Sequence, residues 1–276
     1  MAEPVRAALA AAATALAATS DTPRLDAELL MAHALGCTRE DMLLRRLAAP
    51  APAGFAALLA RRLAHEPVAY ITGCRAFWTI ELIVGPGVLV PRADSETLIE
   101  AAVDHFRARS PARLLDLGTG PGTLLLAALA EWPAAEGLGI DASDTALGYA
   151  ERNAAALGLA GRATFRRGDW AAGVTGRFDL ILANPPYIGT AEPLPAEVAG
   201  HEPARALYAG EDGLDAYRAL IPRLPALLAP GGVAVLEIGH KQAAPVTALL
   251  AGQGLAATLR HDLGGRPRAL VAGVPQ

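Results

Sequence analysis

The feature that most constrains the fold is a regular alternation of strand-like and helix-like segments from residue 113 onward. Short apolar runs predict seven strands, at residues 113–115, 137–140, 163–166, 178–182, 233–237, 256–259 and 269–272. Helical patterns separate most of them, which predicts parallel βαβ units and a doubly wound α/β sheet. Only a short link with Gly264 and Gly265 separates the last two runs. We therefore expect them to pair as an antiparallel C-terminal hairpin.

The segment from Pro4 to about Thr72 is helical in pattern throughout. In one stretch, Asp21 or Thr22 is a suitable N-cap and Gly36 a suitable stop for a helix with apolar residues on one face. The pattern predicts a small bundle of four or five short helices. Because no compact set of catalytic side chains occurs there, we interpret this region as a packing or docking module.

A β-branched and aromatic stretch, residues 77–90, follows the helical region. With Gly85-Pro86-Gly87 as its turn, it predicts a β-hairpin. We therefore divide the chain into a helical domain at 1–73, a hairpin at 74–91 and an α/β domain at 92–276.

Composition excludes several classes of protein. Apolar residues make up 53% of the 276 residues and charged residues 19%, so the chain is not a disordered protein. The formal net charge of -4 gives no overall attraction to nucleic acid. Two separate cysteines and six histidines without metal-ligand spacing indicate neither a disulfide framework nor a metal site.

The N-terminal run from Ala7 to Ser20 is alanine-rich and uncharged. It is shorter than the ~20 residues that a membrane-spanning helix needs. We interpret it as an ordinary helix rather than a signal peptide, and expect a cytoplasmic protein with no membrane partner.

The first candidate site is the glycine-rich loop after the strand that ends near Asp116. Gly118, Gly120 and Gly122 allow a sharp turn and close approach of a ligand to the backbone. Such a loop suits a dinucleotide site, a methyl-donor site or a plain tight turn. Its G-x-G-x-G spacing departs from the G-x-G-x-x-G of dinucleotide-binding folds.

Acidic residues follow the next two strands. Asp141 ends the second strand, where a carboxylate can accept both hydroxyl hydrogens of a ribose; it could equally cap the next helix. Asp169 and Trp170 follow the third strand, at the expected position of an adenine ring. There Asp169 could accept from the exocyclic amine and Trp170 could provide a flat apolar contact, although a strand-end Asp is more often a turn residue.

The fourth predicted strand runs directly into Asn184-Pro185-Pro186-Tyr187. The two prolines lack N–H groups, so the local carbonyls are free to accept hydrogen bonds, and Asn184 adds a side-chain carbonyl. Tyr187 offers a ring that can stack on a planar group. Together these residues predict a binding site for an NH₂ group on an sp² carbon.

All four candidate segments follow successive strands, so they should line one crevice at the carboxyl edge of the sheet. The sequence predicts an adenosine-like ligand on one side of this crevice. An amide or amine acceptor is predicted on the other.

In these motifs the sequence closely resembles the N5-glutamine methyltransferases that modify peptide-chain release factors. The resemblance covers nearly the whole chain and is carried by "RLDAELLMAHALG", "EPVAYITG", "VLVPRADSETLIE", "DLGTGPG", "DASDTAL", "NPPYI", "HEPARALYAGEDGLDAYR", "LAPGGVAVLEIG" and "DLGGRPRALV". Pro121 in the glycine loop and Ser95, where threonine is usual, depart from the family pattern.

The resemblance implies a class I S-adenosylmethionine-dependent methyltransferase fold, which is Rossmann-like and has a seven-stranded sheet. It also implies that the N-terminal helices dock the protein substrate and that the hairpin connects them to this fold. It implies S-adenosylmethionine as methyl donor, with S-adenosylhomocysteine as product and no metal. The acceptor would be the glutamine amide of the release factors' Gly-Gly-Gln loop. The residues expected to hold the donor are Gly118, Thr119, Gly120, Pro121, Gly122, Asp141, Asp169, Trp170 and Asn184.

Asn184, Pro185, Pro186 and Tyr187 are expected to bind the acceptor amide, with Asn184, Pro185 and Tyr187 in the catalytic roles. His201-Glu202-Pro203 either shapes the acceptor pocket or caps a helix. Arg92 either helps close the site or pairs with Asp94 or Glu96.

The sequence motifs are also compatible with three other functions. A nucleic-acid methyltransferase acting on adenine N6, cytosine N4 or guanine N2 could use the same Asn-Pro-Pro-Tyr pocket. Against it stand the net charge of -4 and the absence of an evident basic strip, so we expect no direct nucleic-acid partner. A non-catalytic docking module and a nicotinamide oxidoreductase fit the acceptor residues less well.

Overall fold

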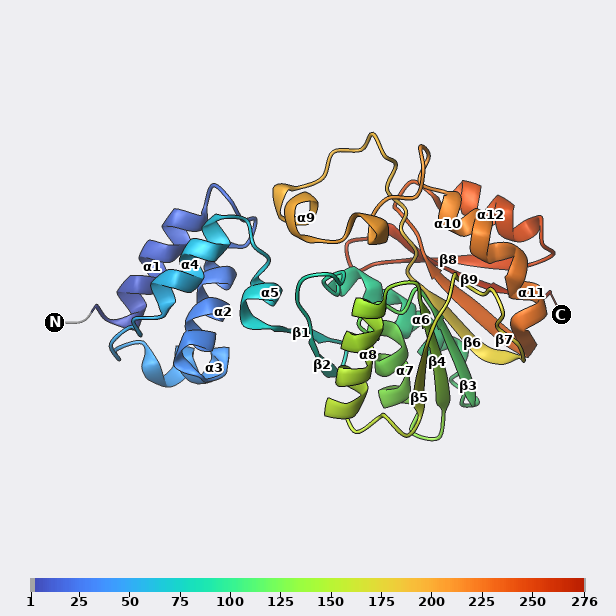
Figure 1. Cartoon of the computed structure of the whole chain (residues 1–276), viewed down its shortest axis with the longest axis horizontal. Coiled ribbons are helices and arrows are strands. Elements are labelled where there is room, and N and C mark those ends of the chain that lie inside the picture. Colours follow the sequence, from blue (N-terminus) through green and yellow to red (C-terminus); the bar gives the residue numbers. More distant parts are fainter. Residues whose placement is uncertain (1–2, 276) are drawn as a thin grey trace. The chain divides into compact units, whose positions relative to one another are not determined.

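The structure, a computed structural model, describes residues 3–275 of the chain. The chain forms two compact units: residues up to 74 together with 194–201, and residues 75–193 together with 202–276. Each unit has its own buried apolar core. Figure 1 traces the elements of both along the sequence.

The first unit is helical and is held together by apolar side chains with no exposed surface, among them Leu9, Leu30 and Met42. α2 begins with Pro23 after Thr22 and ends at Gly36, whose φ of +62° favours glycine, as the sequence predicts. In the described residues the unit consists of α1 (Val5–Leu16), α2 (Pro23–Leu35), α3 (Arg39–Asp41), the π-helical turn η1 (Met42–Arg46), α4 (Phe55–Leu63), α5 (Val68–Thr72) and α9 (Ala196–His201).

A buried arginine joins α9 to the other helices of this unit. Arg62 on α4 is 4% exposed. Its guanidinium forms ion pairs with Asp26 at 2.7 Å and with Glu197 of α9 at 2.8 Å. A buried charge needs such partners, so these two carboxylates are tied to Arg62.

The second unit is built on a seven-stranded sheet in the described residues, with the order β5-β4-β3-β6-β7-β9-β8. The pairs from β5 to β7 are parallel, whereas β9 is antiparallel to both β7 and β8. The strands are β3 (Arg113–Leu117), β4 (Glu136–Asp141), β5 (Ala163–Arg167), β6 (Phe178–Ala183), β7 (Leu228–Glu237), β8 (Ala256–His261) and β9 (Pro267–Gly273). The doubly wound sheet with a C-terminal antiparallel hairpin is therefore confirmed.

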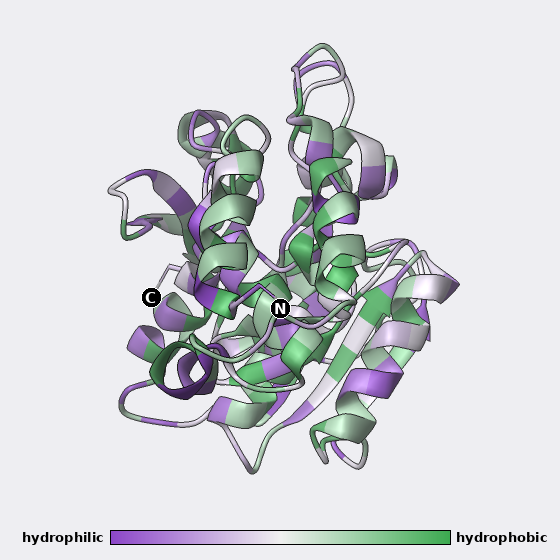
Figure 2. Cartoon of the chain, turned by 90° about the vertical axis from the view of Figure 1, so that its left-hand side faces the viewer, coloured by the Kyte–Doolittle hydropathy of each residue, from purple (hydrophilic) through white to green (hydrophobic). Residues whose placement is uncertain are grey.

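Helices cover both faces of this sheet (Figure 1). On one face lie α6 (Glu96–His105), α7 (Thr123–Glu131) and α8 (Asp144–Ala156), and on the other α10 (Asp215–Leu220), α11 (Leu224–Leu227) and α12 (Ala243–Ala251). The short 3₁₀ turns η2 (Ala93–Ser95), η3 (Ala204–Ala206) and η4 (Ile221–Arg223) complete the elements. Figure 2 shows hydrophobic and hydrophilic residues alternating along many of the chain's helices, as is typical of helices that bury one side.

The hairpin exists, but the sequence analysis placed its turn wrongly. β1 (Cys74–Phe77) and β2 (Ile80–Ile83) are joined through Trp78-Thr79, and the Gly85-Pro86-Gly87 segment follows the hairpin. Trp78 adopts a left-handed φ of +53°, which is uncommon for such a residue. Side chains distant in sequence stabilise the turn, because Glu96 accepts from the Trp78 N–H at 2.8 Å and Glu131 from its indole N–H at 3.2 Å.

Asn153 of α8 connects the hairpin to the glycine-rich loop. Its side chain is completely buried. The amide Nδ2 donates to the carbonyls of Ile83 at 3.0 Å and Pro121 at 2.9 Å, and Oδ1 accepts from the Ile83 N–H at 2.7 Å. One side chain thus satisfies three backbone groups of two separate segments.

We expect Asn153→Ala to lower the free energy of unfolding by about 3 kcal/mol, because it leaves buried backbone groups without partners. Urea denaturation followed by circular dichroism measures the change. Glu151→Ala, an exposed position on the same helix, is the control and should change the value by less than about 0.5 kcal/mol. Equal effects of the two substitutions would contradict a structural role for Asn153.

Candidate active site

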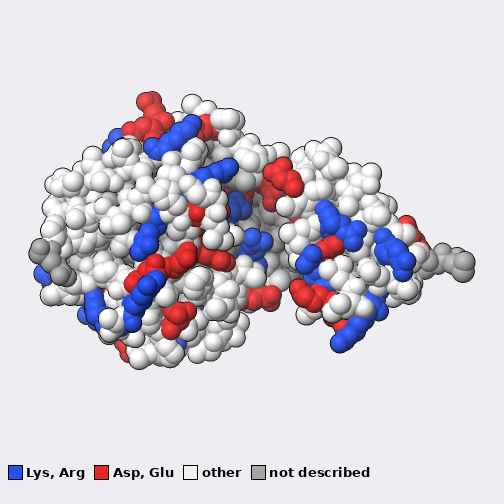
Figure 3. All heavy atoms as spheres, turned by 180° about the vertical axis from the view of Figure 1, so that it is seen from behind, with Lys and Arg blue, Asp and Glu red and all other residues white. Residues whose placement is uncertain are grey.

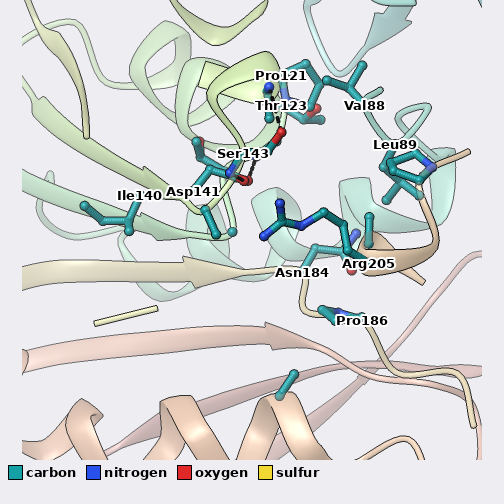
Figure 4. A pocket seen from close by; sticks show the side chains of 18 of the residues that line it. Val88, Leu89, Pro121, Thr123, Ile140, Asp141, Ser143, Asn184, Pro186 and Arg205 are labelled. Carbon is teal, nitrogen blue, oxygen red and sulfur yellow. Dashed lines mark hydrogen bonds between the residues drawn. The ribbon is translucent and has the colours of Figure 1, made fainter. Parts of the chain in front are cut away.

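A cavity of about 460 Å³ opens at the carboxyl ends of β3, β4, β5 and β6. It lies at the point where the strand order reverses, since β4 and β6 flank β3 on opposite sides. Most of the residues predicted for the site line it (Figure 4). They are Gly118, Thr119, Gly120, Pro121, Asp141, Asp169, Trp170, Asn184 and Pro186.

Gly122, Pro185 and Tyr187, also predicted for the site, do not line this cavity. Gly122 precedes α7 with a φ of +86°, and a Cβ there would lie 2.8 Å from the side chain of Leu126. Pro185 is buried. The Tyr187 hydroxyl donates to Glu237 at 3.4 Å, and burial raises the pKa of Tyr187 to about 12. The roles assigned to Gly122, Pro185 and Tyr187 therefore stay predictions.

The glycine-rich loop is shaped by its own backbone bonds and by Trp170. The N–H groups of Gly118 and Thr119 both donate to the carbonyl of Ile140, at 2.8 and 2.9 Å. Gly118 has a φ of +77°, and a Cβ there would lie 3.3 Å from the Trp170 ring. Glycine at 118 is thus required both by the turn and by the packing of the predicted adenine-contacting residue.

Asp116 contributes a buried carboxyl group that the sequence analysis did not include in the site. It is 1% exposed and lines the cavity. Oδ2 accepts from the Thr119 hydroxyl at 2.7 Å and from the Leu125 N–H at 3.2 Å, whereas Oδ1 has no partner among the described residues. Burial raises the pKa of Asp116 to about 7. An unpartnered acceptor in this position suits a cationic or N–H-bearing ligand group.

Asp141 is held by the backbone rather than acting as a helix cap. Its Oδ2 accepts from the Gly120 N–H at 2.9 Å and its Oδ1 from the Ser143 N–H at 2.8 Å. The N-cap of α8 is Ser143, whose hydroxyl accepts from the Ala146 N–H. Each carboxylate oxygen keeps a further acceptor position, so Asp141 can still bind a pair of hydroxyl groups.

On the opposite side of the cavity, Asn184 directly follows β6. Its Nδ2 donates to the hydroxyl of Ser95 at 3.2 Å. Ser95 in turn donates to Glu237 at 2.5 Å, and burial raises the pKa of Glu237 to about 7. With its nitrogen engaged, Asn184 has a side-chain carbonyl available to accept from a ligand.

Two arginines also line the cavity. Arg92 forms its ion pair with Glu202, so the expected pairing with Asp94 or Glu96 was wrong. Glu202 is buried and also accepts from the Val90 N–H at 3.0 Å, and the adjacent Pro203 lines the cavity. The sequence analysis missed Arg205, whose side chain extends into the cavity between Asp141 and Asn184 (Figure 4).

Two further properties concern the whole described chain. Within residues 3–275, no set of three or more His, Cys, Asp or Glu side chains is placed to hold a metal ion. The same residues contain no helix long and apolar enough to span a bilayer.

Solved structures support the fold of the second unit. A ribosomal-protein methylase from Lactobacillus delbrueckii matches 70% of this chain and 84% of its own with a TM-score of 0.53 at 24% identity. A 16S rRNA N2 methyltransferase of T. thermophilus, solved with AdoMet and guanosine, matches 73% of this chain and 50% of its own with a TM-score of 0.52 at 20% identity. The second unit thus has the class I methyltransferase fold.

Sequence comparisons are more specific. Residues 7–73 match the family described as PrmC N-terminal domain, and residues 93–194 match the methyltransferase small domain. Release factor glutamine methyltransferase from Rhodospirillum rubrum is 48% identical over 91% of this chain and 79% of its own. That from Cereibacter sphaeroides is 46% identical over 97% of this chain and 98% of its own. By its sequence, its two matched domains and its fold, the chain belongs to the family of release factor glutamine methyltransferases.

Proposed function

We propose that the protein transfers a methyl group from S-adenosylmethionine to the side-chain amide N5 of the glutamine in the Gly-Gly-Gln motif of peptide-chain release factors. The observation that carries this proposal is the Asn184 amide, which lies across one cavity from Asp141 and whose carbonyl oxygen has no hydrogen-bond partner within residues 3–275. The names of the relatives support the acceptor. The reaction belongs in the cytoplasm, where release factors act, and requires no metal.

The donor side of the cavity fits S-adenosylmethionine in three respects. Asp116 presents an oxygen that has no partner in the described part of the chain and can accept from the donor's ammonium group. Asp141 keeps acceptor positions for the ribose hydroxyls, and Trp170 with Asp169 lies where the adenine is expected. When bound, the donor supplies an electrophilic methyl group and leaves as S-adenosylhomocysteine.

On the acceptor side, the difficulty is that an amide nitrogen is a poor nucleophile, since its lone pair is delocalised into the carbonyl. In the proposed arrangement, Asn184 Oδ1 and the Pro185 carbonyl accept the two N–H hydrogens, and Tyr187 holds the amide plane. Fixing the nitrogen toward the donor can supply several kcal/mol without a strong base. The methylated nitrogen is very acidic and loses one proton to solvent after the transfer, which gives the neutral N-methyl amide. Consistent with this, no histidine or lysine occurs among the described residues that line the cavity.

The chain's other parts are assigned accordingly. The helical region 1–73 docks the release factor, and residues 92–276 bind the donor and the glutamine. The hairpin 74–91 connects these two regions. The alternative function, methylation of an amino group of a nucleic-acid base, requires a basic surface to bind the phosphates. On the face of the molecule shown in Figure 3, the basic side chains lie among acidic ones and form no continuous basic strip.

The test of the function is methyl transfer from labelled S-adenosylmethionine to a purified release factor, beside the same factor with its loop glutamine changed to alanine. We expect label on the unchanged factor alone. Transfer to RNA or DNA, with neither factor labelled, would assign the enzyme to the nucleic-acid methyltransferases instead.

Asn184→Ala should lower kcat by about 100-fold or more, because the acceptor amide loses the group that orients it. The dissociation constant of S-adenosylhomocysteine, measured by calorimetry, should change far less. Equal losses in turnover and in donor affinity would contradict the acceptor role of Asn184.

Asp141→Ala should weaken donor binding by about 10- to 100-fold, the effect of losing charge-assisted hydrogen bonds. Calorimetry with S-adenosylhomocysteine measures the dissociation constant. Asp144→Ala removes an exposed carboxylate three residues away and serves as the matched control, with unchanged affinity expected. An Asp141→Ala variant with the affinity of this control would remove Asp141 from the donor site.

A further inference from the structure

A chain of hydrogen bonds leads from the end of β7 to the acceptor side of the cavity. Glu237, 2% exposed, accepts from the Ser95 hydroxyl through Oε2 at 2.5 Å. The same hydroxyl oxygen accepts from Asn184 Nδ2 at 3.2 Å. Ser95 is itself 2% exposed and Asn184 is half-buried at the cavity wall, so the bond between Ser95 and Glu237 is shielded from water. We call the three side chains the Glu237–Ser95–Asn184 relay.

The direction of this relay follows from counting hydrogens. A serine hydroxyl has one hydrogen, and a carboxylate can only accept. Ser95 must therefore give its hydrogen to Glu237, which leaves its oxygen able only to accept. If the Asn184 side-chain amide were rotated so that Oδ1 and Nδ2 exchanged places, Oδ1 would face the Ser95 oxygen. Both atoms would then be acceptors, with no hydrogen between them. The amide is thus fixed with Nδ2 toward Ser95 and Oδ1 away from it.

Burial raises the pKa of Glu237 to about 7, and the hydrogen-bond donors and the cation around it oppose this shift. Besides Ser95, the Tyr187 hydroxyl donates to Oε1 at 3.4 Å, and Arg268 Nη1 lies 4.0 Å from the same oxygen. The Tyr217 hydroxyl bonds the Glu237 main-chain carbonyl at 2.8 Å. The acidic groups nearby, Asp94 and Asp262, are paired with Arg268 at 3.0 and 3.4 Å.

We infer that Ser95 and Glu237 are positioning residues that set the orientation of the Asn184 amide and so keep its carbonyl directed at the acceptor's N–H hydrogens. Neither residue needs to touch the substrate. The inference rests on the proposed function, because it assumes that Asn184 binds the acceptor through Oδ1.

The relay also predicts a pH dependence. A protonated Glu237 can donate to Ser95, and the serine hydrogen is then free to turn toward Asn184. The amide loses its fixed orientation, so kcat should fall as the pH drops through the pKa of Glu237, which burial raises to about 7. Burial also raises the pKa of Asp116 to about 7, but Asp116 lies on the donor side of the cavity. The pH profile of kcat is therefore measured at a saturating concentration of the donor.

Ser95→Ala should lower kcat by about 10-fold, as expected for the loss of one hydrogen bond that orients a reacting group, while the dissociation constant of S-adenosylhomocysteine changes by less than about twofold. Ser95→Thr keeps the hydroxyl and should restore most of the lost kcat. Thr97→Ala removes another buried hydroxyl two residues further along the chain and is the matched control, with wild-type kcat expected.

Glu237→Gln keeps the shape but can donate as well as accept, so it should lower kcat and abolish the fall in kcat between pH 8 and pH 6. A side-chain readout needs no activity: in ¹⁵N-labelled protein the Asn184 NH₂ hydrogens should exchange with water faster in Ser95→Ala than in the wild type. Wild-type kcat in Ser95→Ala, or equal exchange rates in the two proteins, would overturn the inference.

Failure of the proposed function is distinguishable from failure of this inference. If the wild type methylates no release factor but another amide or amine, the same variants are measured with that acceptor. The exchange experiment and the comparison of Ser95→Ala with Ser95→Thr then still decide whether Ser95 orients Asn184.

Discussion

The position of β3 between β4 and β6 is the constraint on which the site depends. The chain leaves β3 toward β4 and β5, then returns to place β6 on its other side. The loops after β3 and β6 therefore diverge and leave an opening at the carboxyl edge. Asp116 and the glycine-rich loop lie on one side of this opening and Asn184 lies on the other, as the proposed transfer between two substrates requires.

Two carboxyl groups are buried at the same edge of the sheet, and each has a different task. Asp116 and Glu237 are 1% and 2% exposed, and burial raises the pKa of both to about 7. One oxygen of Asp116 has no partner among residues 3–275, as expected of a group that binds a ligand. Glu237 is surrounded by donors and acts on Asn184 through Ser95. Burial strengthens both interactions, because competing water is excluded.

The segment between Tyr187 and Asp215 shows how one insertion serves both units. Its ends are held by a parallel bridge between Ile188 and Tyr208 in the second unit. Its middle forms α9, which belongs to the helical unit and pairs with buried Arg62. The segment therefore links the acceptor motif, through the covalent chain, to the helices to which we assign docking.

The sequence by itself determined the order of strands and helices along the chain, the C-terminal hairpin and nine of the residues that line the cavity. These features depend on local patterns: apolar runs of strand length, glycines at positive φ, and polar residues directly after each strand. It also determined the family, because motifs such as "NPPYI" and "HEPARAL" are contiguous.

Only the tertiary structure decided which distant side chains meet. The pairing of Arg92 with Glu202, the turn at Trp78 held by Glu96 and Glu131, and the Glu237–Ser95–Asn184 relay each join residues from separate elements. No local pattern encodes such contacts, since the partners become neighbours only when the sheet and its helices pack. For the same reason the unpartnered oxygen of Asp116 becomes evident only once its burial and surroundings are known.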